Sequence, residues 1–357
     1  MKTYNVAVVG CGNISGQYLK ELTKNSPNLR IVAVCDQNEE KAETTREAFQ
    51  IEKRLTFGEI TVDPSIDVVL ILTPPQSHFE LAKRAIQAKK HVYLEKPLSQ
   101  EYRQGKELLR LAKKNGILLG CAPDTFMGSG IQTCRKLIEN GEIGDLLGAS
   151  AFMTRHGPED WHPNPAFFYQ TGGGPLYDMG PYYLTALIAL LGRVDSVSGM
   201  CAPIIPERKI EFGANAGKSV RSEIPTHIHG LLRFSKGYVG SILTTFDVWG
   251  SRLPHIEIHG TRGTISANHP NLFSGAVFLK RFSEDNFQEV PLIENCFSSR
   301  ADGIRDMVNA LARGSKNFSA HGQRALHALE IMEAIQKSDR EHREISLESD
   351  PEYSAFL

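Results

Sequence analysis

The chain has 357 residues, 40 of them Lys or Arg and 41 Asp or Glu, which gives a pI of about 6.9. This length is enough for two domains of ordinary size, each with its own apolar core. A near-neutral chain without a dense basic stripe is a poor candidate for binding nucleic acid. No apolar run approaches the roughly 18 residues of a membrane span, and the start MKTYNVAVVGCG lacks a signal-peptide pattern. We therefore expect a cytoplasmic protein that does not bind membranes.

The cysteines do not show the spacing of a metal or redox site. No two of them form a C-x-x-C pair, and several lie inside apolar runs. Buried free thiols in a reducing compartment explain them better than structural zinc or a redox dithiol. The six are Cys11, Cys35, Cys121, Cys134, Cys201 and Cys296.

Strand and helix patterns alternate through the first third of the chain. Apolar, β-branched runs predict strands, and amphipathic runs between them predict helices. The predicted strands cover 4–10, 29–36, 67–75, 91–97 and 117–123, and the predicted helices cover 14–24, 39–50, 77–88 and 101–116. Nearly continuous apolar strands joined by helices indicate a parallel sheet covered on both faces. We expect a doubly wound domain over 1–123.

The pattern changes after residue 123. A helix is predicted over 129–140 and a strand over 146–157, and 225–290 reads as consecutive strands with a hairpin at the SKG turn. Two more helices are predicted over 301–313 and 321–339, and 202–224 reads as a long loop. These features predict a second domain over 124–357, of α+β class, with a mostly antiparallel open sheet.

The sequence VAVVGCGNIS carries a G-x-G-x-x-S pattern between a strand and a helix. Gly10 permits a tight turn, and Gly12 lets the backbone approach a pyrophosphate at the start of the helix, where Asn13 and Ile14 lie. Asp36 ends the second strand, where an acidic residue binds ribose hydroxyls and repels a 2′-phosphate. We predict an NAD site, with NADP as the alternative. The plainer interpretation is a glycine turn with an aspartate that caps the next helix.

Two further strand ends carry candidate cofactor contacts. TPPQSH places Thr73, Pro74, Pro75 and His78 after the strand that begins at residue 67. The prolines keep the backbone extended at the carboxyl edge of the sheet, where ligands of open α/β sheets bind. An ordinary proline turn with Ser77 as helix cap would give the same pattern.

The next strand ends in YLEKP, with Glu95 and Lys96. A lysine at this edge, beside a nicotinamide, can hold a substrate hydroxyl and stabilise the alkoxide that forms as hydride leaves. Taken alone, a lysine after a strand is more often a solvated surface group.

GCGNIS, TPPQSH, EKP and the later GGGPLYDMG together resemble the Gfo/Idh/MocA family of oxidoreductases, over nearly the whole chain. The resemblance implies a Rossmann domain followed by a second domain whose open sheet joins subunits into a homodimer or homotetramer. It implies reversible hydride transfer between a nicotinamide and a sugar, polyol or related alcohol. Lys96 matches the family's catalytic lysine, and Asp178 and Tyr182 match its D-x-G-x-H/Y pattern.

The resemblance also implies roles for the segment that contains these two residues. GGG would bring backbone close to the nicotinamide, and Tyr182 would take the hydroxyl proton, assisted by the charge of Lys96. Asp178 would orient the substrate or the lysine. Without the resemblance, Asp178 reads equally well as a helix cap and Tyr182 as a half-buried helix residue.

The chain departs from the family before GGG, where many members carry a Trp-Arg pair and this chain has AFFYQT. Upstream, His156, Trp161 and His162 lie among prolines, a composition that suits a neutral sugar through stacking and hydroxyl contacts. A metal site at these histidines is the weaker alternative, because no matching carboxylate helix is present. Asp124, after the last strand of the first domain, is a further substrate candidate, with helix capping as its alternative.

We thus expect an NAD-dependent oxidoreductase that acts on a sugar, polyol or sugar derivative. Two other activities within the family stay open at this stage. One is cleavage of glycosidic bonds with transient use of NAD, and the other is ligand sensing without turnover.

Overall fold

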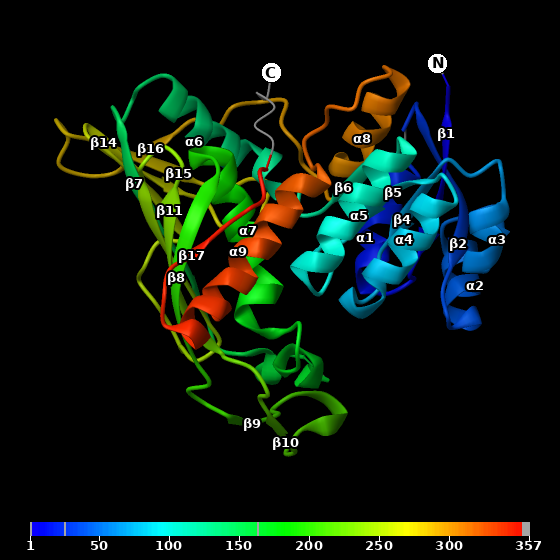
Figure 1. The fold of residues 1–357 in the computed structure, drawn as a ribbon, viewed down its shortest axis with the longest axis horizontal. Helices are drawn as coiled ribbons and strands as arrows, with labels where there is room; N and C mark the ends of the chain where they lie inside the picture. The colour runs from blue at the N-terminus through cyan, green and yellow to red at the C-terminus, as the bar shows by residue number, and fades with distance from the viewer. Residues whose placement is uncertain (1, 25, 163, 352–357) are drawn as a thin grey trace. The chain divides into compact units, whose positions relative to one another are not determined.

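The computed structural model describes residues 2–24, 26–162 and 164–351, which form two compact units. The first unit contains the chain up to Asp124 together with Phe297–Leu329, and the second contains Thr125–Cys296 and Glu330–Pro351. Figure 1 gives the order of the elements along the chain. Each unit is built around its own sheet.

The sheet of the first unit has six parallel strands in the order β3-β2-β1-β4-β5-β6. The strands are β1 Tyr4–Val9, β2 Leu29–Cys35, β3 Lys53–Arg54, β4 Val68–Ile71, β5 His91–Leu94 and β6 Leu119–Cys121. From β1 the chain adds β2 and β3 on one side and then returns to add β4 to β6 on the other side. This reversal creates the crevice in which open α/β sheets bind ligands, at the carboxyl ends of β1 and β4. The predicted doubly wound fold is confirmed.

Apolar cores cover both faces of this sheet because successive strand residues point to opposite sides. Val6 and Val8 join one core and Ala7 and Val9 the other. The helices that join the strands are α1 Asn13–Leu22, α2 Glu39–Ala48, α3 Phe57–Val62, α4 His78–Gln87 and α5 Tyr102–Asn115. Helix α1 packs in the first core, whereas α3, α4 and α5 pack in the second.

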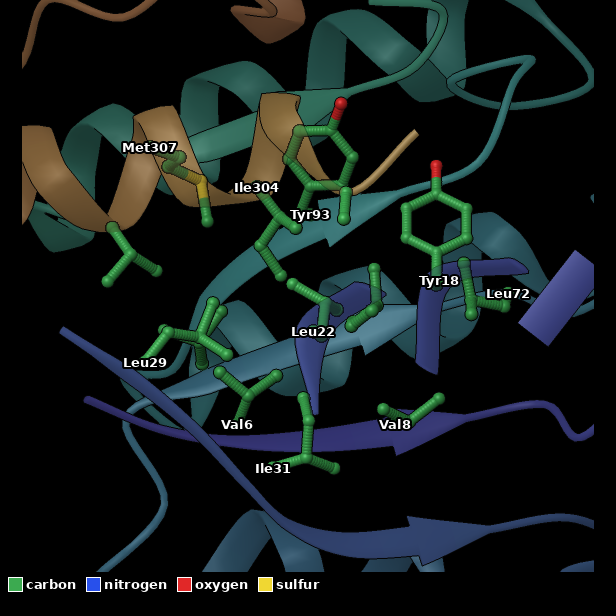
Figure 2. Close-up of a cluster of buried hydrophobic side chains, with 14 of the residues drawn as sticks. Val6, Val8, Tyr18, Leu22, Leu29, Ile31, Leu72, Tyr93, Ile304 and Met307 are labelled. Atoms are coloured by element: carbon green, nitrogen blue, oxygen red, sulfur yellow. The ribbon is translucent and has the colours of Figure 1, made fainter. Parts of the chain in front are cut away.

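The first unit also uses residues from the end of the chain. Helix α8 (Asp302–Ala312) places Ile304 and Met307 in the same core as Val6 and Val8, as Figure 2 shows. Helix α9 (Gly322–Glu341) begins in the first unit and continues in the second. We predicted a second domain running without interruption over 124–357. The structure differs because the apolar face of α8 completes a core of the first unit.

The second unit contains a nine-stranded sheet in the order β16-β15-β14-β13-β7-β12-β11-β8-β17. Its neighbouring strands are antiparallel except for the parallel pair β7 and β12, as expected for a mostly antiparallel sheet. The strands are β7 Leu146–Thr154, β8 Val194–Ala202, β11 His227–Phe234, β12 Val239–Thr245, β13 Ile256–Gly260, β14 Gly263–Ala267, β15 Val277–Arg281, β16 Gln288–Val290 and β17 Ile345–Ser346. Helices α6 (Ser129–Glu139) and α7 (Gly174–Leu191) lie in this unit.

The two faces of this sheet differ in character. On the covered face, Ile228, Leu232 and Ile242 are buried, and Ile335 of α9 lies against Gly230. On the other face, the side chains of Met200, Leu231 and Val239 are 76%, 57% and 52% exposed. Their strands, β8, β11 and β12, are neighbours toward the β17 end of the sheet.

The segment 202–224, predicted to be a long loop, contains two short strands. Strands β9 (Glu207–Lys209) and β10 (Ser219–Arg221) pair as a separate antiparallel ribbon. Among the described residues, no helix is both long enough and apolar enough to cross a membrane.

Candidate active site

The glycine turn after β1 is shaped by a close approach to β4. Gly10 has φ of +102°, and a Cβ there would lie 2.7 Å from the carbonyl carbon of Leu72. A Cβ at Gly12 would meet no atom within 4 Å, so space is open beside the start of α1. The turn therefore combines a backbone that only glycine adopts easily with free space at a helix N-terminus, the features that a pyrophosphate site needs.

Asp36 is held against this turn by backbone hydrogen bonds. Its carboxylate accepts from the backbone N–H of Cys11 (2.8 Å) and from that of Asn38 (2.8 Å). The predicted ribose-binding carboxylate thus lies beside the glycine turn, at the carboxyl end of β2. The residue that caps α2 is Asn38 rather than Asp36, since the Asn38 side chain accepts from the N–H of Lys41.

His78 connects the two loops that follow β4 and β5. The ring is fully buried, with Nδ1 2.7 Å from the carbonyl oxygen of Pro97 and Nε2 2.8 Å from that of Thr73. Burial lowers the pKa of His78, which favours the neutral ring. Each nitrogen faces a protein carbonyl, and the single N–H of the neutral ring donates to one of them, between the loops that contain Thr73 and Lys96. Pro74 is exposed and Pro75 partly so at the same edge.

Glu95 and Lys96 occupy the end of β5. The Glu95 carboxylate is buried and accepts from the Tyr18 hydroxyl at 2.8 Å and from the backbone N–H of Lys96 at 3.1 Å. Lys96 is only partly buried, whereas its neighbours in the sequence are buried. Glu95 therefore fixes the backbone from which the Lys96 side chain extends.

Asp124 is fully buried and accepts a hydrogen bond of 2.8 Å from the backbone N–H of Gly303, at the start of α8. Burial raises the pKa of this carboxyl to about 8. The side chain is therefore largely protonated at neutral pH. Its predicted substrate contact stays a prediction.

The GGG run that precedes α7 fits closely against its own unit. Gly172 and Gly174 have φ of +85° and +83°. A Cβ on Gly173 would lie 2.7 Å from the carbonyl oxygens of both Phe167 and Phe168. Backbone packing within the second unit thus requires these glycines, whatever they contribute to cofactor binding.

The adjacent residues Tyr182 and Tyr183 point in different directions from helix α7. Adjacent helix positions point about 100° apart, whereas positions four apart share a face. Asp178 is partly buried and Tyr182, one turn later, is 6% exposed. Tyr183 is buried on another face, with its hydroxyl 3.2 Å from Nδ1 of His255.

An aromatic loop, residues 155–169, precedes the glycine run. The ring centre of His162 lies 5.3 Å from that of Trp161 and 5.4 Å from that of Phe168. The Arg155 guanidinium lies over the ring of Trp161. Trp161 is 45% exposed. His156 stacks instead on Trp249, with 3.7 Å between ring centres. Within residues 2–24, 26–162 and 164–351, no three metal-binding side chains form a group that could hold a metal ion.

A buried ion-pair network anchors the aromatic loop, and the sequence did not reveal it. The Arg208 side chain, 1% exposed, donates 2.8 Å to Glu159 and also pairs with Asp247. The Tyr169 hydroxyl donates to Glu159 as well. Arg208 lies on β9, so this ribbon, the aromatic loop and the end of β12 are joined at one guanidinium.

The predicted site residues thus fall into two sets. At the carboxyl edge of the first sheet lie Gly10, Gly12, Asn13, Ile14, Asp36, Thr73, Pro74, Pro75, Glu95 and Lys96, with His78 and Asp124 buried. On the aromatic loop and α7 of the second unit lie His156, Trp161, His162, Asp178 and Tyr182.

The strand order, the glycine turn and the carboxylate beside it define a dinucleotide-binding α/β protein of the Rossmann type. Comparison with protein families agrees and gives the family. Residues 4–122 match the model of the oxidoreductase family with an NAD-binding Rossmann fold, and residues 131–266 match the GFO/IDH/MocA C-terminal domain. The chain belongs to the GFO/IDH/MocA family of NAD-binding oxidoreductases.

Characterised relatives include two dehydrogenases. A levoglucosan dehydrogenase of Pseudarthrobacter phenanthrenivorans is 28% identical over 254 residues, which are 66% of this chain and 64% of the relative. An NADP-dependent scyllo-inositol 2-dehydrogenase of Bacillus subtilis is 24% identical over 316 residues, 81% of each chain.

Solved structures share the fold over almost the whole chain. An NAD-binding oxidoreductase from Klebsiella pneumoniae has a TM-score of 0.84 at 21% identity, covering 98% of this chain and 100% of that one. A levoglucosan dehydrogenase in complex with NADH and L-sorbose has a TM-score of 0.83 at 23% identity, with the same coverage.

Proposed function

We propose that this chain uses NAD to oxidise a hydroxyl group of a sugar, polyol or sugar derivative, or to reduce the corresponding carbonyl. The observation that carries the proposal is the position of Lys96. Its backbone is fixed by Glu95 at the carboxyl end of β5, in the sheet whose glycine turn and Asp36 form the dinucleotide site.

Each of the proposed catalytic residues has a separate role in the reaction. When bound, the nicotinamide accepts the hydride from the substrate carbon or returns it. Lys96 holds the substrate hydroxyl and stabilises the negative charge that develops on its oxygen. In its tyrosinate form, Tyr182 accepts the hydroxyl proton, so that the alcohol loses one hydride and one proton and becomes a carbonyl. Asp178, one helical turn before Tyr182, orients the substrate or the lysine.

The aromatic loop and the relatives favour a neutral, hydroxyl-rich substrate. An exposed Trp161 beside His162 offers an apolar face and hydrogen-bonding edges. Levoglucosan and scyllo-inositol, named for two relatives, are both neutral polyhydroxy compounds.

The proposal is tested by measuring the absorbance of reduced nicotinamide while a panel of sugars and polyols is offered with NAD or NADP. Substrate-dependent formation of reduced cofactor supports it. Product release without a net change in cofactor would indicate the glycosidase activity instead, and cofactor binding without turnover on any compound would indicate a sensor.

Asp36→Ala should weaken NAD binding and lower the preference for NAD over NADP by about tenfold or more, since the carboxylate repels a 2′-phosphate. Dissociation constants for both cofactors measure this. Glu40→Ala, an exposed carboxylate on α2, is the control and should leave both constants unchanged. A wild-type preference for NADP would contradict the assignment.

Tyr182→Phe should lower kcat by at least about tenfold, because the phenolate of Tyr182 accepts the proton. Tyr183→Phe removes a hydroxyl that contacts His255 on another face, so kcat should stay within a few-fold. Steady-state rates and thermal melts of the pair decide between them. If Tyr183→Phe abolishes turnover and Tyr182→Phe does not, the proton-transfer role is wrong.

We also propose that the chain forms a homodimer or homotetramer through the exposed face of the nine-stranded sheet. Met200, Leu231 and Val239 give this face exposed apolar side chains that a second copy would cover. Sedimentation velocity of the purified chain measures the assembly, and a monomer at micromolar concentration would contradict the proposal.

A further inference from the structure

A cavity in the first unit lies away from every residue assigned above. Its volume is 470 Å³, and it is lined by the second half of α5, the chain entering β6, and residues between Lys316 and Gln323. This region is at the start of β6, whereas the glycine turn, Asp36 and Lys96 follow the carboxyl ends of their strands. Because the strands are parallel, the cavity and the dinucleotide site occupy opposite edges of the sheet.

The lining of the cavity is cationic at its rim. Arg110 and Lys113 lie three residues apart on α5 and so share one face of the helix, and Lys316 comes from the segment after α8. The lining includes no Asp or Glu. Within the described part of the chain, none of these three cations makes an ion pair, so their charge is not neutralised locally.

The interior adds an apolar surface, to which Leu109, Ile117 and Leu119 contribute.

We propose that this cavity binds a small organic anion: a phosphate ester or carboxylate with an apolar body. Arg110, Lys113 and Lys316 hold the anionic group, and the apolar walls hold the body. Its volume lies within the usual range for small-molecule sites. The proposal does not rest on the proposed function, because it uses no residue of the dinucleotide edge or of α7.

The test is equilibrium binding of three matched probes to the full chain, followed by probe fluorescence, with NAD present to occupy the dinucleotide site. 1-Naphthyl phosphate and 1-naphthoate carry an anion on an apolar body, and 1-naphthol has the same body without the permanent charge. At least one anion should bind about tenfold or more tightly than the naphthol. The tighter anion distinguishes a phosphate-binding site from a carboxylate-binding site.

Charge reversal locates the site. Lys113→Glu should weaken binding of the tighter anion by about tenfold or more, and Lys316→Glu should do the same from a different segment. Lys114→Glu makes the same charge change at an exposed neighbour outside the cavity, so affinity should stay within about twofold. Failure of both anions to bind, or equal loss in Lys113→Glu and Lys114→Glu, would overturn the proposal.

Discussion

Lys96→Met should lower turnover by about a hundredfold or more while NAD binding survives. Methionine keeps most of the volume of the lysine stem but removes the charge and the donors that stabilise the developing alkoxide. The backbone N–H of residue 96 can still donate to Glu95, so the end of β5 should keep its conformation. Steady-state kinetics and NAD titration of the same preparation separate the two effects.

Lys41→Met, on the exposed side of α2, is the matched control and should behave as wild type. Two results would change the assignment of Lys96. Turnover close to wild type would mean that the lysine is structural. Loss of NAD binding in parallel with turnover would mean that it serves the cofactor rather than the substrate.

Arg208→Met should destabilise the second unit by about 3–5 kcal/mol. The substitution leaves the Glu159 and Asp247 carboxylates buried without the cation that compensates their charge. Since Glu159 also accepts from Tyr169, the aromatic loop should lose its anchor as well. Denaturant unfolding, followed by tryptophan fluorescence of Trp161 and Trp249, reports on this unit.

Arg233→Met is the comparison for this prediction. Arg233 pairs with Glu344 at 3.1 Å, but both side chains are largely exposed, so water and salt already screen the pair. Its loss should hardly move the unfolding midpoint. Equal midpoints for the two variants would show that the buried network contributes no more than a surface pair.

Five of the six strands of the first sheet could be predicted because their information is local, whereas the two-residue strand β3 was missed. Each strand is an apolar run of four to seven residues bounded by turn signals, apart from the short outer strands, and the glycine turn follows directly after β1. Parallel order then places strand ends such as Asp36 and Lys96 at one edge. The family pattern supplied the rest of the candidate site, since Asp178 and Tyr182 are ordinary helix residues by spacing alone.

Features that depend on long-range pairing could not be predicted. Arg208 meets one carboxylate from 49 residues before it and another from 39 residues after it, and its own segment reads as a polar loop. The double contact of His78 was equally hidden, because the partners are backbone carbonyls that any sequence provides. Helix α8 has the same amphipathic pattern whichever core it joins.

Because α8 returns to the first unit, that unit can complete its core only late in synthesis. The ribosome synthesises the glycine turn after β1 and the six strands of the first sheet early. It adds Ile304 and Met307 only after nearly all of the second unit. Until then Val6, Val8 and Tyr18 lack part of their apolar cover (Figure 2). The nascent first unit therefore remains incomplete for most of translation. A gene fragment ending at residue 124 would encode a sheet whose two cores both lack residues, α8 in one and Ala325 and Leu326 in the other.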